Sequence, residues 1–423
     1  MALKRRDFLR LAAAGAGAAT LSACGGAGLF GQKSARIVVI GGGFGGATTA
    51  KYLRMWNDQL QVTLIERNPN FVSCPFSNLV LGGSKTMADI THGYDALRTK
   101  YGVNVMQAEV TGIDPAKQTV TTRNGTISYD RLVLSPGIDF MYDSLPMLAS
   151  ADAQEKIPHS WKAGPQTVIL RKQLEAMKNG GVYVLSIPKA PYRCPPGPYE
   201  RACQVASYFK KHKPKSKVII LDANPEVTSK KGLFMKAWAD MYPGMVEYKP
   251  NNAAESVDVG TRTIKTGFEK IRADVLNVVP PQKAGAVAGL AGVANVDNRW
   301  CSVDFLTYES KAQKNIHVIG DAIAAPLPKS GHMANQTGKI CAGAIVALVN
   351  GDPVFATPKF ANTCYSFVDD KQAMNVAGVY KFDPEKKTMA GIAESTGVSK
   401  GPSDIEGGYA QAWAKNIWSD VLK

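Results

Sequence analysis

A glycine-rich turn near the N-terminus constrains the fold of this 423-residue chain more than any other feature. A predicted strand at 36–40 runs directly into the turn Gly41-Gly42-Gly43-Phe44-Gly45-Gly46. A helical stretch then follows from Ala47 to Trp56, and a second predicted strand covers 61–66. This order of strand, G-x-G-x-x-G turn, helix and strand is typical of a dinucleotide-binding βαβ unit.

Each position of this motif has a physical reason. Gly41 allows the tight turn, Gly43 lets the backbone approach a pyrophosphate, and Gly46 permits close packing of helix on strand. The N-terminus of the helix faces the phosphates with unpaired N–H groups. Glu66 ends the second strand 20 residues after Gly46, where its carboxylate can accept the ribose hydroxyls.

Two later segments favour FAD over NAD as the dinucleotide. A predicted strand at 129–134 ends in Ser135-Pro136-Gly137 and resembles the turn that closes the first half of the FAD domain in two-domain flavoproteins. A predicted strand at 315–319 ends in Gly320-Asp321 and resembles the second FAD fingerprint, whose Asp binds the ribityl chain. The helix predicted from Ser330 to Val349 would point its positive end at the flavin.

A second α/β unit is predicted at about 161–280, but its phosphate cradle is replaced. Its first strand, at 181–187, leads into the proline-rich run 188–198 where an NAD domain would have glycines. Prolines lack a backbone N–H and fix φ, which is the opposite of what a phosphate cradle needs. The second strand, at 217–222, is ordinary. We therefore expect an NAD-domain fold without NAD binding.

These patterns predict an α/β fold with two Rossmann-like dinucleotide-binding domains of the disulfide-reductase flavoprotein type and a small C-terminal interface domain. The C-terminal part is poor in periodic pattern except for a helical end that carries Tyr409, Trp413 and Trp418. The predicted boundaries are 1–31 for an export signal, 32–160 with 281–352 for a discontinuous FAD-binding domain, 161–280 for the central domain and 353–423 for the C-terminal domain.

The N-terminus predicts export. Lys4-Arg5-Arg6-Asp7-Phe8-Leu9-Arg10, followed by an Ala/Gly-rich stretch, is typical of a twin-arginine signal, which delivers folded proteins to the periplasm. The simpler alternative is a disordered basic tail. Leu21-Ser22-Ala23-Cys24 resembles a lipobox, which would tether the protein to a membrane through a lipid on Cys24. The small residues there could equally serve an ordinary signal peptidase.

The net charge indicates which kinds of molecule the protein is expected to bind. The whole chain carries +15, and removing residues 1–31 takes away four positive charges and one negative, which leaves +12. A basic surface favours acidic proteins, anionic substrates or anionic lipid. No run of five or six basic residues or nucleic-acid motif is present, so nucleic acid is not expected as a partner. The cysteine and histidine spacings predict no metal site.

Three cysteine-containing segments resemble a known family, the flavoprotein subunit of flavocytochrome c sulfide dehydrogenase. The segments are Phe71-Val72-Ser73-Cys74-Pro75-Phe76-Ser77-Asn78, Tyr192-Arg193-Cys194-Pro195-Pro196-Gly197-Pro198-Tyr199-Glu200-Arg201 and Asn362-Thr363-Cys364-Tyr365-Ser366. Shorter matches are Pro280-Pro281-Gln282, Trp300-Cys301 and Pro328-Lys329-Ser330-Gly331. The resemblance covers essentially the whole chain after the export signal.

The resemblance implies a set of roles. It implies that Cys74 carries FAD through the flavin 8α-methyl group, and that Cys194 and Cys364 form a redox-active disulfide beside the ring. It places Lys329 at the cofactor, and it implies sulfide as substrate with a cytochrome c subunit as electron acceptor. This sequence has Pro75 after the flavin cysteine, where the family can have an aromatic residue.

The residues around Cys194 allow an independent expectation. Cys194 precedes a predicted helix and has Arg193 and Arg201 nearby, and both features favour a thiolate. Cys203 lies too far along that helix to pair with it. Glu200 could relay protons beside the cysteines, or it could form an ion pair with one of the two arginines.

The function predicted from the sequence is oxidation of sulfide by attack on the Cys194–Cys364 disulfide, with electrons passing through FAD to cytochrome c in the periplasm. The nearest alternative is a sulfide:quinone oxidoreductase, which shares the two-domain fold but needs an apolar quinone channel. A third is a non-catalytic exported flavoprotein that binds a cytochrome or a sulfur carrier.

Overall fold

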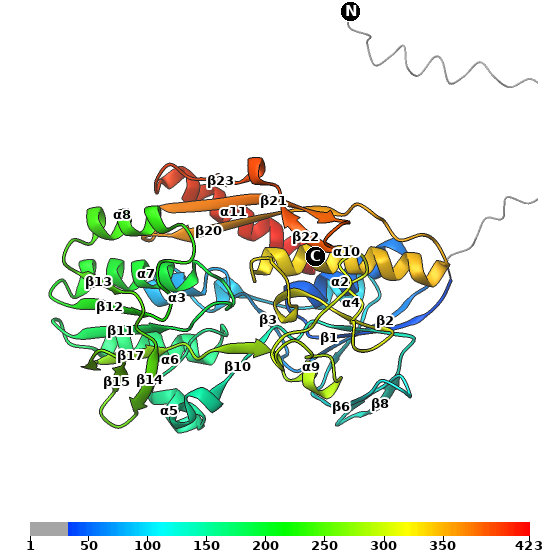
Figure 1. The fold of residues 1–423 in the computed structure, drawn as a ribbon, viewed down its shortest axis with the longest axis horizontal. Helices are drawn as coiled ribbons and strands as arrows, with labels where there is room; N and C mark the ends of the chain where they lie inside the picture. The colour runs from blue at the N-terminus through cyan, green and yellow to red at the C-terminus, as the bar shows by residue number, and fades with distance from the viewer. Residues whose placement is uncertain (1–32) are drawn as a thin grey trace, which may run out of the picture. The chain divides into compact units, whose positions relative to one another are not determined.

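The computed structural model describes residues 33–423, which belong to one compact unit (Figure 1). The predicted export signal and Cys24 lie outside the described residues. Within 33–423, no helix is long and apolar enough to cross a membrane, and no group of acidic, histidine and cysteine side chains is suited to hold a metal. The compact unit is not divided further, so the internal domain boundaries stay predictions.

The first sheet is parallel and five-stranded, in the order β19-β9-β1-β2-β5. Its strands are β1 (Arg36–Ile40), β2 (Gln61–Glu66), β5 (Asn104–Gln107), β9 (Arg131–Leu134) and β19 (Ile316–Val318). Helices α2 (Phe44–Trp56) and α10 (Gly331–Asn350) pack against each other. The central strand β1 is almost entirely buried, as expected for a covered parallel sheet. The carboxyl ends of β1, β2 and β9 meet at one edge, where such sheets bind ligands.

Smaller elements extend this half. The antiparallel meander β6 (Val110–Asp114), β7 (Thr119–Thr122) and β8 (Gly125–Ser128) joins β5 to β9. The other elements are β3 (Phe71–Val72), α3 (Ser77–Gly82), η1 (Ala88–Ile90), β4 (Thr91–His92), α4 (Asp95–Thr99), α9 (Val287–Leu290) and η4 (Gly320–Ala322). Strands β3 and β4 pair and flank the turn that contains Cys74.

The second sheet is also parallel, in the order β13-β12-β11-β17. Its elements are α6 (Pro165–Ala176), β11 (Val182–Ile187), α7 (Gly197–His212), β12 (Lys217–Asp222), α8 (Lys231–Met241), β13 (Val246–Lys249) and β17 (Val275–Val278). Around it lie η2 (Tyr142–Ser144), η3 (Pro146–Leu148), α5 (Ala151–Lys156) and the antiparallel strands β14 (Ala254–Asp258), β15 (Thr263–Thr266) and β16 (Lys270–Arg272). The chain passes between the two halves along the antiparallel pair β10 (Ile138–Phe140) and β18 (Gln282–Ala284).

The C-terminal region is more regular than the sequence indicated, so the expectation of little periodic structure is wrong. It contains β20 (Lys359–Phe367), β21 (Ala373–Asp383), β22 (Thr388–Gly391), η5 (Ala393–Ser395), β23 (Gly397–Val398) and α11 (Asp404–Leu422). Strand β20 is hard to recognise because its buried side chains include the polar Asn362 and Ser366. The sheet crosses the top of the molecule in Figure 1, and β20 contacts both α7 and α10.

Candidate active site

A cavity open to solvent lies at the carboxyl ends of β1, β2 and β9. Five of the predicted cofactor-binding residues line it, namely Gly41, Gly43, Glu66, Ser135 and Gly137. It therefore occupies the edge of the first sheet where the glycine motif predicted a dinucleotide.

The glycines of the motif explain why this cavity is open. Gly41 has φ +99°, and a Cβ there would overlap the carbonyl oxygen of Ser135. A Cβ at Gly46 would overlap the carbonyl oxygen of Gly41, so helix α2 can approach β1 only with glycine at this position. A Cβ at Gly43 would meet no atom within 4 Å, and Gly43 lines the cavity, so the backbone is left free for a ligand to approach.

The polar groups at this cavity fit a dinucleotide. Gly43 caps α2 without any side-chain hydrogen bond, so the first N–H groups of the helix are available to phosphate oxygens. One oxygen of Glu66 accepts the Gly42 N–H at 2.7 Å, and the other accepts the backbone and side-chain N–H groups of Asn68 at 2.9 and 2.8 Å. The fixed carboxylate keeps further lone pairs that can accept ribose hydroxyls.

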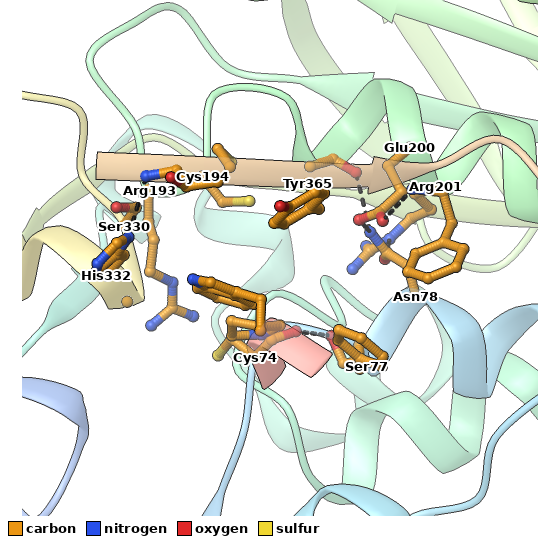
Figure 2. Close-up of a pocket in the computed structure, with 18 of the residues that line it drawn as sticks. Cys74, Ser77, Asn78, Arg193, Cys194, Glu200, Arg201, Ser330, His332 and Tyr365 are labelled. Atoms are coloured by element: carbon orange, nitrogen blue, oxygen red, sulfur yellow. Dashed lines mark hydrogen bonds between the residues drawn. The ribbon is translucent and has the colours of Figure 1, made fainter. Parts of the chain in front are cut away.

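A second cavity adjoins the first, and Arg193 lines both. It brings together three cysteines that are far apart in the sequence, Cys74, Cys194 and Cys364. In the view of Figure 2, Cys74 lies below the centre of this cavity and Cys194 above it, with Glu200 at one end. Two adjoining cavities suit a cofactor with a nucleotide half and a ring half.

Asp321 provides a separate test of whether FAD fits. It follows β19 in the turn Gly320–Ala322, it is buried, and its Oδ1 has no hydrogen-bond partner. Burial raises the pKa of its carboxyl group, while the charges of Arg193 and Lys329 oppose this rise. A buried oxygen without a donor is unusual, and a polyhydroxyl chain such as ribityl would satisfy it.

Lys329, which the resemblance places at the cofactor, is bonded to the turn that holds Asp321, and its role at the cofactor stays a prediction. It lines neither cavity, and its ammonium donates to the carbonyl oxygens of Asp321 and Ile323 at 2.7 and 2.8 Å. The ammonium also lies 3.8 Å from the ring centroid of Trp300. Burial lowers the pKa of Lys329 to about 8. Its visible role in this structure is to hold the turn after β19.

The turn that presents Cys74 is tightly held. The backbone N–H and the hydroxyl of Ser77 both donate to the carbonyl oxygen of Cys74, at 3.0 and 2.6 Å. Phe76 adopts the left-handed conformation with φ 73° and packs edge-on against Trp418, with 5.8 Å between ring centroids. Phe76 thus supplies an aromatic contact next to Pro75, the position at which this chain departs from the family.

Cys194 is fixed at the N-terminus of α7. Its φ is +58°, its N–H donates to the carbonyl oxygen of Lys329 at 2.7 Å, and its own carbonyl accepts the Gly197 N–H at 2.8 Å. The sulfur lies so close to Gly197 that a Cβ there would be 2.9 Å from it. The Arg193 N–H donates to Oε1 of the buried Gln282 at 2.8 Å, which anchors the loop to β18.

The structure contains Cys194 and Cys364 as free thiols in one cavity, so the predicted disulfide is not formed in it. Cys364 lies on β20, and the packing of that strand on α7 brings it to Cys194. Cys203 is separate from both, since it is buried and accepts the indole N–H of Trp238 at 3.2 Å.

The expectation that Cys194 favours its thiolate is wrong for this structure. Burial raises its pKa well above the ordinary value, and Cys364 and Glu200 raise it further. Lys230 and Arg193 act in the opposite direction and are outweighed. The helix end and the arginine lie where the sequence placed them, but removal of the sulfur from water decides the direction.

Glu200 and Arg201 are joined through an amide rather than paired directly. Nδ2 of Asn78 donates to Glu200 at 2.8 Å, and Oδ1 of Asn78 accepts from Arg201 at 3.1 Å. Glu200 also accepts the Phe367 N–H at 2.9 Å, and Arg201 donates to Asn277 at 2.8 Å. Burial raises the pKa of Glu200. Of the two roles considered for Glu200, the ion pair is absent from the described residues, and a role in proton transfer stays a prediction.

Lys230 is a site residue that no sequence pattern indicated. Its ammonium donates to the carbonyl oxygen of Cys364 and to the hydroxyl of Ser366, both at 2.8 Å. Burial lowers the pKa of Lys230, whereas Cys364, Glu200 and Cys194 raise it. It stands in a run of polar residues that resembles a solvated loop, and only the tertiary fold brings it to the cysteines.

The equivalent cradle in the second half is closed by its own side chains. Asp222 ends β12 as Glu66 ends β2, but it is fully buried. It accepts hydrogen bonds from the hydroxyls of Tyr199 and Tyr248 at 2.7 and 3.0 Å, and from the backbone and side-chain N–H groups of Asn224 at 2.9 and 2.7 Å. The acid that could accept ribose hydroxyls is therefore already saturated by protein donors.

An open dinucleotide cradle, a closed second cradle and an adjoining cysteine cavity define a FAD-binding flavoprotein oxidoreductase built on two Rossmann-like units. Residues 167–280 match the family described as "Sulfide dehydrogenase [flavocytochrome c] flavoprotein chain, central", and 356–422 match "Flavocytochrome c sulphide dehydrogenase, flavin-binding". Residues 35–156 match "Pyridine nucleotide-disulphide oxidoreductase".

A relative from Chlorobaculum thiosulfatiphilum agrees with these matches. It is a sulfide dehydrogenase [flavocytochrome c] flavoprotein chain, 62% identical over 45 residues, which are 94% of that sequence and 11% of this chain. This chain belongs to the family of flavocytochrome c sulfide dehydrogenase flavoprotein chains. The resemblance noted in the sequence is confirmed.

Longer but weaker similarities extend over most of the chain. The sulfide-quinone reductase of Aquifex aeolicus is 26% identical over 375 residues, which are 82% of this chain and 83% of that one. The mitochondrial sulfide:quinone oxidoreductase of Mus musculus is 25% identical over 82% of this chain and 78% of its own. The solved structure of the Aquifex sulfide:quinone oxidoreductase superposes with a TM-score of 0.72 at 22% identity, covering 92% and 91% of the two chains. The predicted fold class is confirmed.

Proposed function

We propose that this chain oxidises sulfide with Cys194 and Cys364, using FAD as the internal electron acceptor and a cytochrome c as the external one. One observation carries the proposal. A single cavity holds both cysteines and Cys74, and it adjoins the dinucleotide cavity through Arg193. A thiol pair beside a flavin site is the arrangement that thiol–disulfide electron transfer requires.

The reaction begins from the oxidised pair. The sulfur of hydrosulfide attacks one sulfur of the Cys194–Cys364 disulfide, the S–S bond breaks, and a new S–S bond forms. One cysteine then carries a persulfide and the other a thiolate, so two electrons have moved from the substrate sulfur to the cysteine pair. Bound FAD would supply a group that accepts two electrons and releases them singly. Glu200, whose pKa is raised by burial, can hold the proton that the persulfide loses when it ionises.

The charges at the cavity suit an anionic substrate. Arg193 and Arg201 line it, and Lys230 lies beside Cys364. Arg201 is buried, and its hydrogen bonds go to neutral oxygens of Asn78, Asn277 and the backbone. Its positive charge therefore has no carboxylate bonded to it among the described residues, which favours the entry of hydrosulfide.

Covalent attachment of FAD through Cys74 is part of the proposal. The tight turn 74–77 holds Cys74 at the cavity wall, which suits a bond to the 8α-methyl group of the flavin. Acid-precipitated protein is expected to stay yellow, whereas a Cys74→Ala variant should release its flavin into the supernatant. Cys301→Ala, at a buried cysteine that lines neither cavity, is the matched control and should stay yellow. Free FAD released from the unaltered protein would refute the linkage.

The external acceptor separates the two candidate functions. A cytochrome fits because His332, Tyr365 and Trp413 line both the cysteine cavity and a depression open to the surface. A quinone is the second candidate, because the two long relatives are named for it. Helix α11 also exposes Ile405 and Tyr409, which lie one turn apart.

A steady-state assay with sulfide decides between these acceptors. Turnover should be fast with cytochrome c and slow with a soluble quinone, and NAD should support none. Preference for quinone would replace the cytochrome with the second candidate. Failure of every acceptor would leave the non-catalytic flavoprotein as the better explanation.

Export to the periplasm, with or without a lipid on Cys24, is also proposed and depends on the N-terminal sequence. Replacing the pair by Arg5→Lys and Arg6→Lys keeps the charge but removes the twin-arginine signature. The variant should remain in the cytoplasm, as measured by cell fractionation. Unchanged periplasmic delivery of the variant would count against this route.

A further inference from the structure

Lys230 connects the central half of the molecule to the C-terminal sheet. It precedes α8, yet its ammonium donates to the carbonyl oxygen of Cys364 and to the hydroxyl of Ser366, both on β20. The next two lysines along the chain behave differently. Lys231 and Lys236 form exposed ion pairs with Glu226 and Asp240, at 2.7 and 2.6 Å.

The backbone at Lys230 is held in a conformation that lysine does not favour. Its φ is +55° and its ψ is 38°, in the left-handed region. Its carbonyl oxygen accepts the Phe234 N–H at 3.0 Å, which begins helix α8. A non-glycine residue in this region stores strain, and such residues cluster at functional sites. Here the strained backbone is the one from which the side chain reaches β20.

Among the described residues, both hydrogen-bond acceptors of the ammonium are neutral, and the ammonium also lies 5.9 Å from the ring centroid of Phe234. It has three N–H donors, and the carbonyl of Cys364 and the hydroxyl of Ser366 account for two of them. In the part of the chain that the structure describes, Lys230 has no ion pair, unlike Lys231 and Lys236, although the more distant charges of Glu200 and Glu406 raise its pKa. A partly buried cation held by neutral groups is stabilised when an anion forms nearby. The bond is to the backbone carbonyl of Cys364, and the thiol of that same residue is the ionisable group whose charge acts most strongly on Lys230.

We propose that Lys230 is a positioning residue that holds Cys364 and stabilises its thiolate, so that Cys364 rather than Cys194 carries the negative charge when the pair is opened. This inference rests on the proposed function, because it assigns roles within the same cysteine pair. If the charge resides on Cys364, sulfide attacks the sulfur of Cys194, and the persulfide forms there.

The titration directions agree with this asymmetry. Burial raises the pKa of both thiols, but for Cys364 the next influence is Lys230, which lowers it. For Cys194 the next influences are Cys364 and Glu200, which raise its pKa further and outweigh the lowering by Lys230, whereas for Cys364 the lowering by Lys230 outweighs the rise caused by Glu200. The titratable groups around Cys364 and Lys230 are Cys194 in the loop before α7, Glu200 on α7, Tyr380 on β21 and Glu406 on α11.

The test measures the reactivity of each thiol as a function of pH. The holoprotein, with its cysteine pair kept reduced under anaerobic conditions, is treated with iodoacetamide, and each alkylated peptide is quantified by mass spectrometry. Cys364 should react at lower pH than Cys194. Lys230→Gln should slow the alkylation of Cys364 on the order of tenfold at pH values below the midpoint of its titration. The reason is that loss of a nearby opposite charge reduces the fraction of Cys364 present as thiolate. Lys230→Arg should restore most of the rate.

The controls separate this inference from the function on which it rests. Lys231 is the next residue and is exposed, so Lys231→Gln should leave the pH dependence of alkylation unchanged for both thiols. Earlier ionisation of Cys194 in the unaltered protein would overturn the proposal without any variant, and so would an unchanged Cys364 profile in Lys230→Gln. Alkylation requires no turnover, so absent sulfide oxidation with the expected profiles would refute the proposed function and leave the role of Lys230 standing.

Discussion

The two halves of this molecule share a βαβ plan and use it for opposite purposes. In the first half, strand β1 leads into glycines, and Glu66 at the end of β2 stands at the rim of an open cavity. In the second half, strand β11 leads into prolines, and Asp222 at the end of β12 is buried under the hydroxyls of Tyr199 and Tyr248. The sheet sets where a site can form, and the loop after the first strand decides what the site contains.

The proline-rich loop 188–198, which stands where an NAD domain would have glycines, supplies a residue of the candidate active site. It delivers Cys194 to the N-terminus of α7, the place where an NAD domain would hold phosphate. The C-terminal strand β20 adds Cys364 from the other side of the same cavity. The sheet edge that would hold phosphate in an NAD domain therefore contributes to a cavity lined by a pair of thiols in this chain.

Breaking the cysteine pair should have the largest effect. Cys194→Ser and Cys364→Ser should each lower sulfide oxidation by at least about a thousandfold, because serine cannot form the disulfide that accepts the electrons. Turnover is measured with sulfide and the preferred acceptor, and the flavin absorbance shows whether cofactor binding is kept.

The matched control for this prediction is Cys203→Ser. Cys203 lies on α7 outside the cavity, and serine there can still accept the Trp238 N–H. It should retain most activity. Loss of folding without loss of turnover per folded molecule in the Cys194 and Cys364 variants would show that these cysteines have a structural role only.

Adding NADH tests directly whether the second half of the molecule is closed to a nicotinamide dinucleotide. We expect micromolar NADH to leave the flavin oxidised, because loop 188–198 lacks the N–H donors of a phosphate cradle and Asp222 is saturated. Stopped-flow absorbance of the flavin, with sulfide as the positive control, measures this. Rapid and stoichiometric bleaching by NADH would break the comparison between the two halves.

Most of the backbone plan could be predicted from the sequence. Strands β1 and β2 have the predicted bounds, because parallel strands covered on both faces form short apolar runs that are easily recognised. Strand β20 was missed because Asn362 and Ser366 are buried in it and interrupt the apolar alternation.

The site was predictable only in part. The shared cavity of Cys194 and Cys364 agrees with an expectation that came from family resemblance, since 170 residues separate them. Lys230 and the amide bridge through Asn78 depend on tertiary contacts that leave no local pattern. The direction of the Cys194 pKa was wrong because neighbouring charges can be read from sequence, whereas burial cannot.

Replacing Asp222 and Glu66 in turn compares the two halves by the free energy of unfolding. Asp222→Ala should lower the free energy of unfolding by about 3 kcal/mol, because it leaves buried hydroxyl and N–H donors without an acceptor. Glu66→Ala removes bonds at a cavity rim and should cost about 1 kcal/mol. Urea denaturation measures both. Equal losses would show that the two acids have the same structural role.

The effect that should be smallest at neutral pH, and that grows only in acid, concerns one buried histidine in each half. Burial lowers the pKa of His159 to about 3, and of His317 in the first half to about 4. Nδ1 of His159 accepts the Trp161 N–H at 2.9 Å, which requires the neutral ring, and the charges of Lys162 and Arg201 also disfavour its protonation.

The sign of the pH dependence follows from these lowered pKa values. Below a pH of about 6.5 the unfolded chain takes up a proton at each histidine while the folded chain does not, so stability is lost as the pH falls from there towards 4. Each histidine should contribute about 1.4 kcal/mol per pH unit within that window. His159→Gln keeps an acceptor for the Trp161 N–H, and it should reduce by one proton the slope of unfolding free energy against pH. His317→Gln should do the same for the first half. A slope unchanged in both variants would mean that these rings are protonated in the folded protein, and burial would not then dominate their titration.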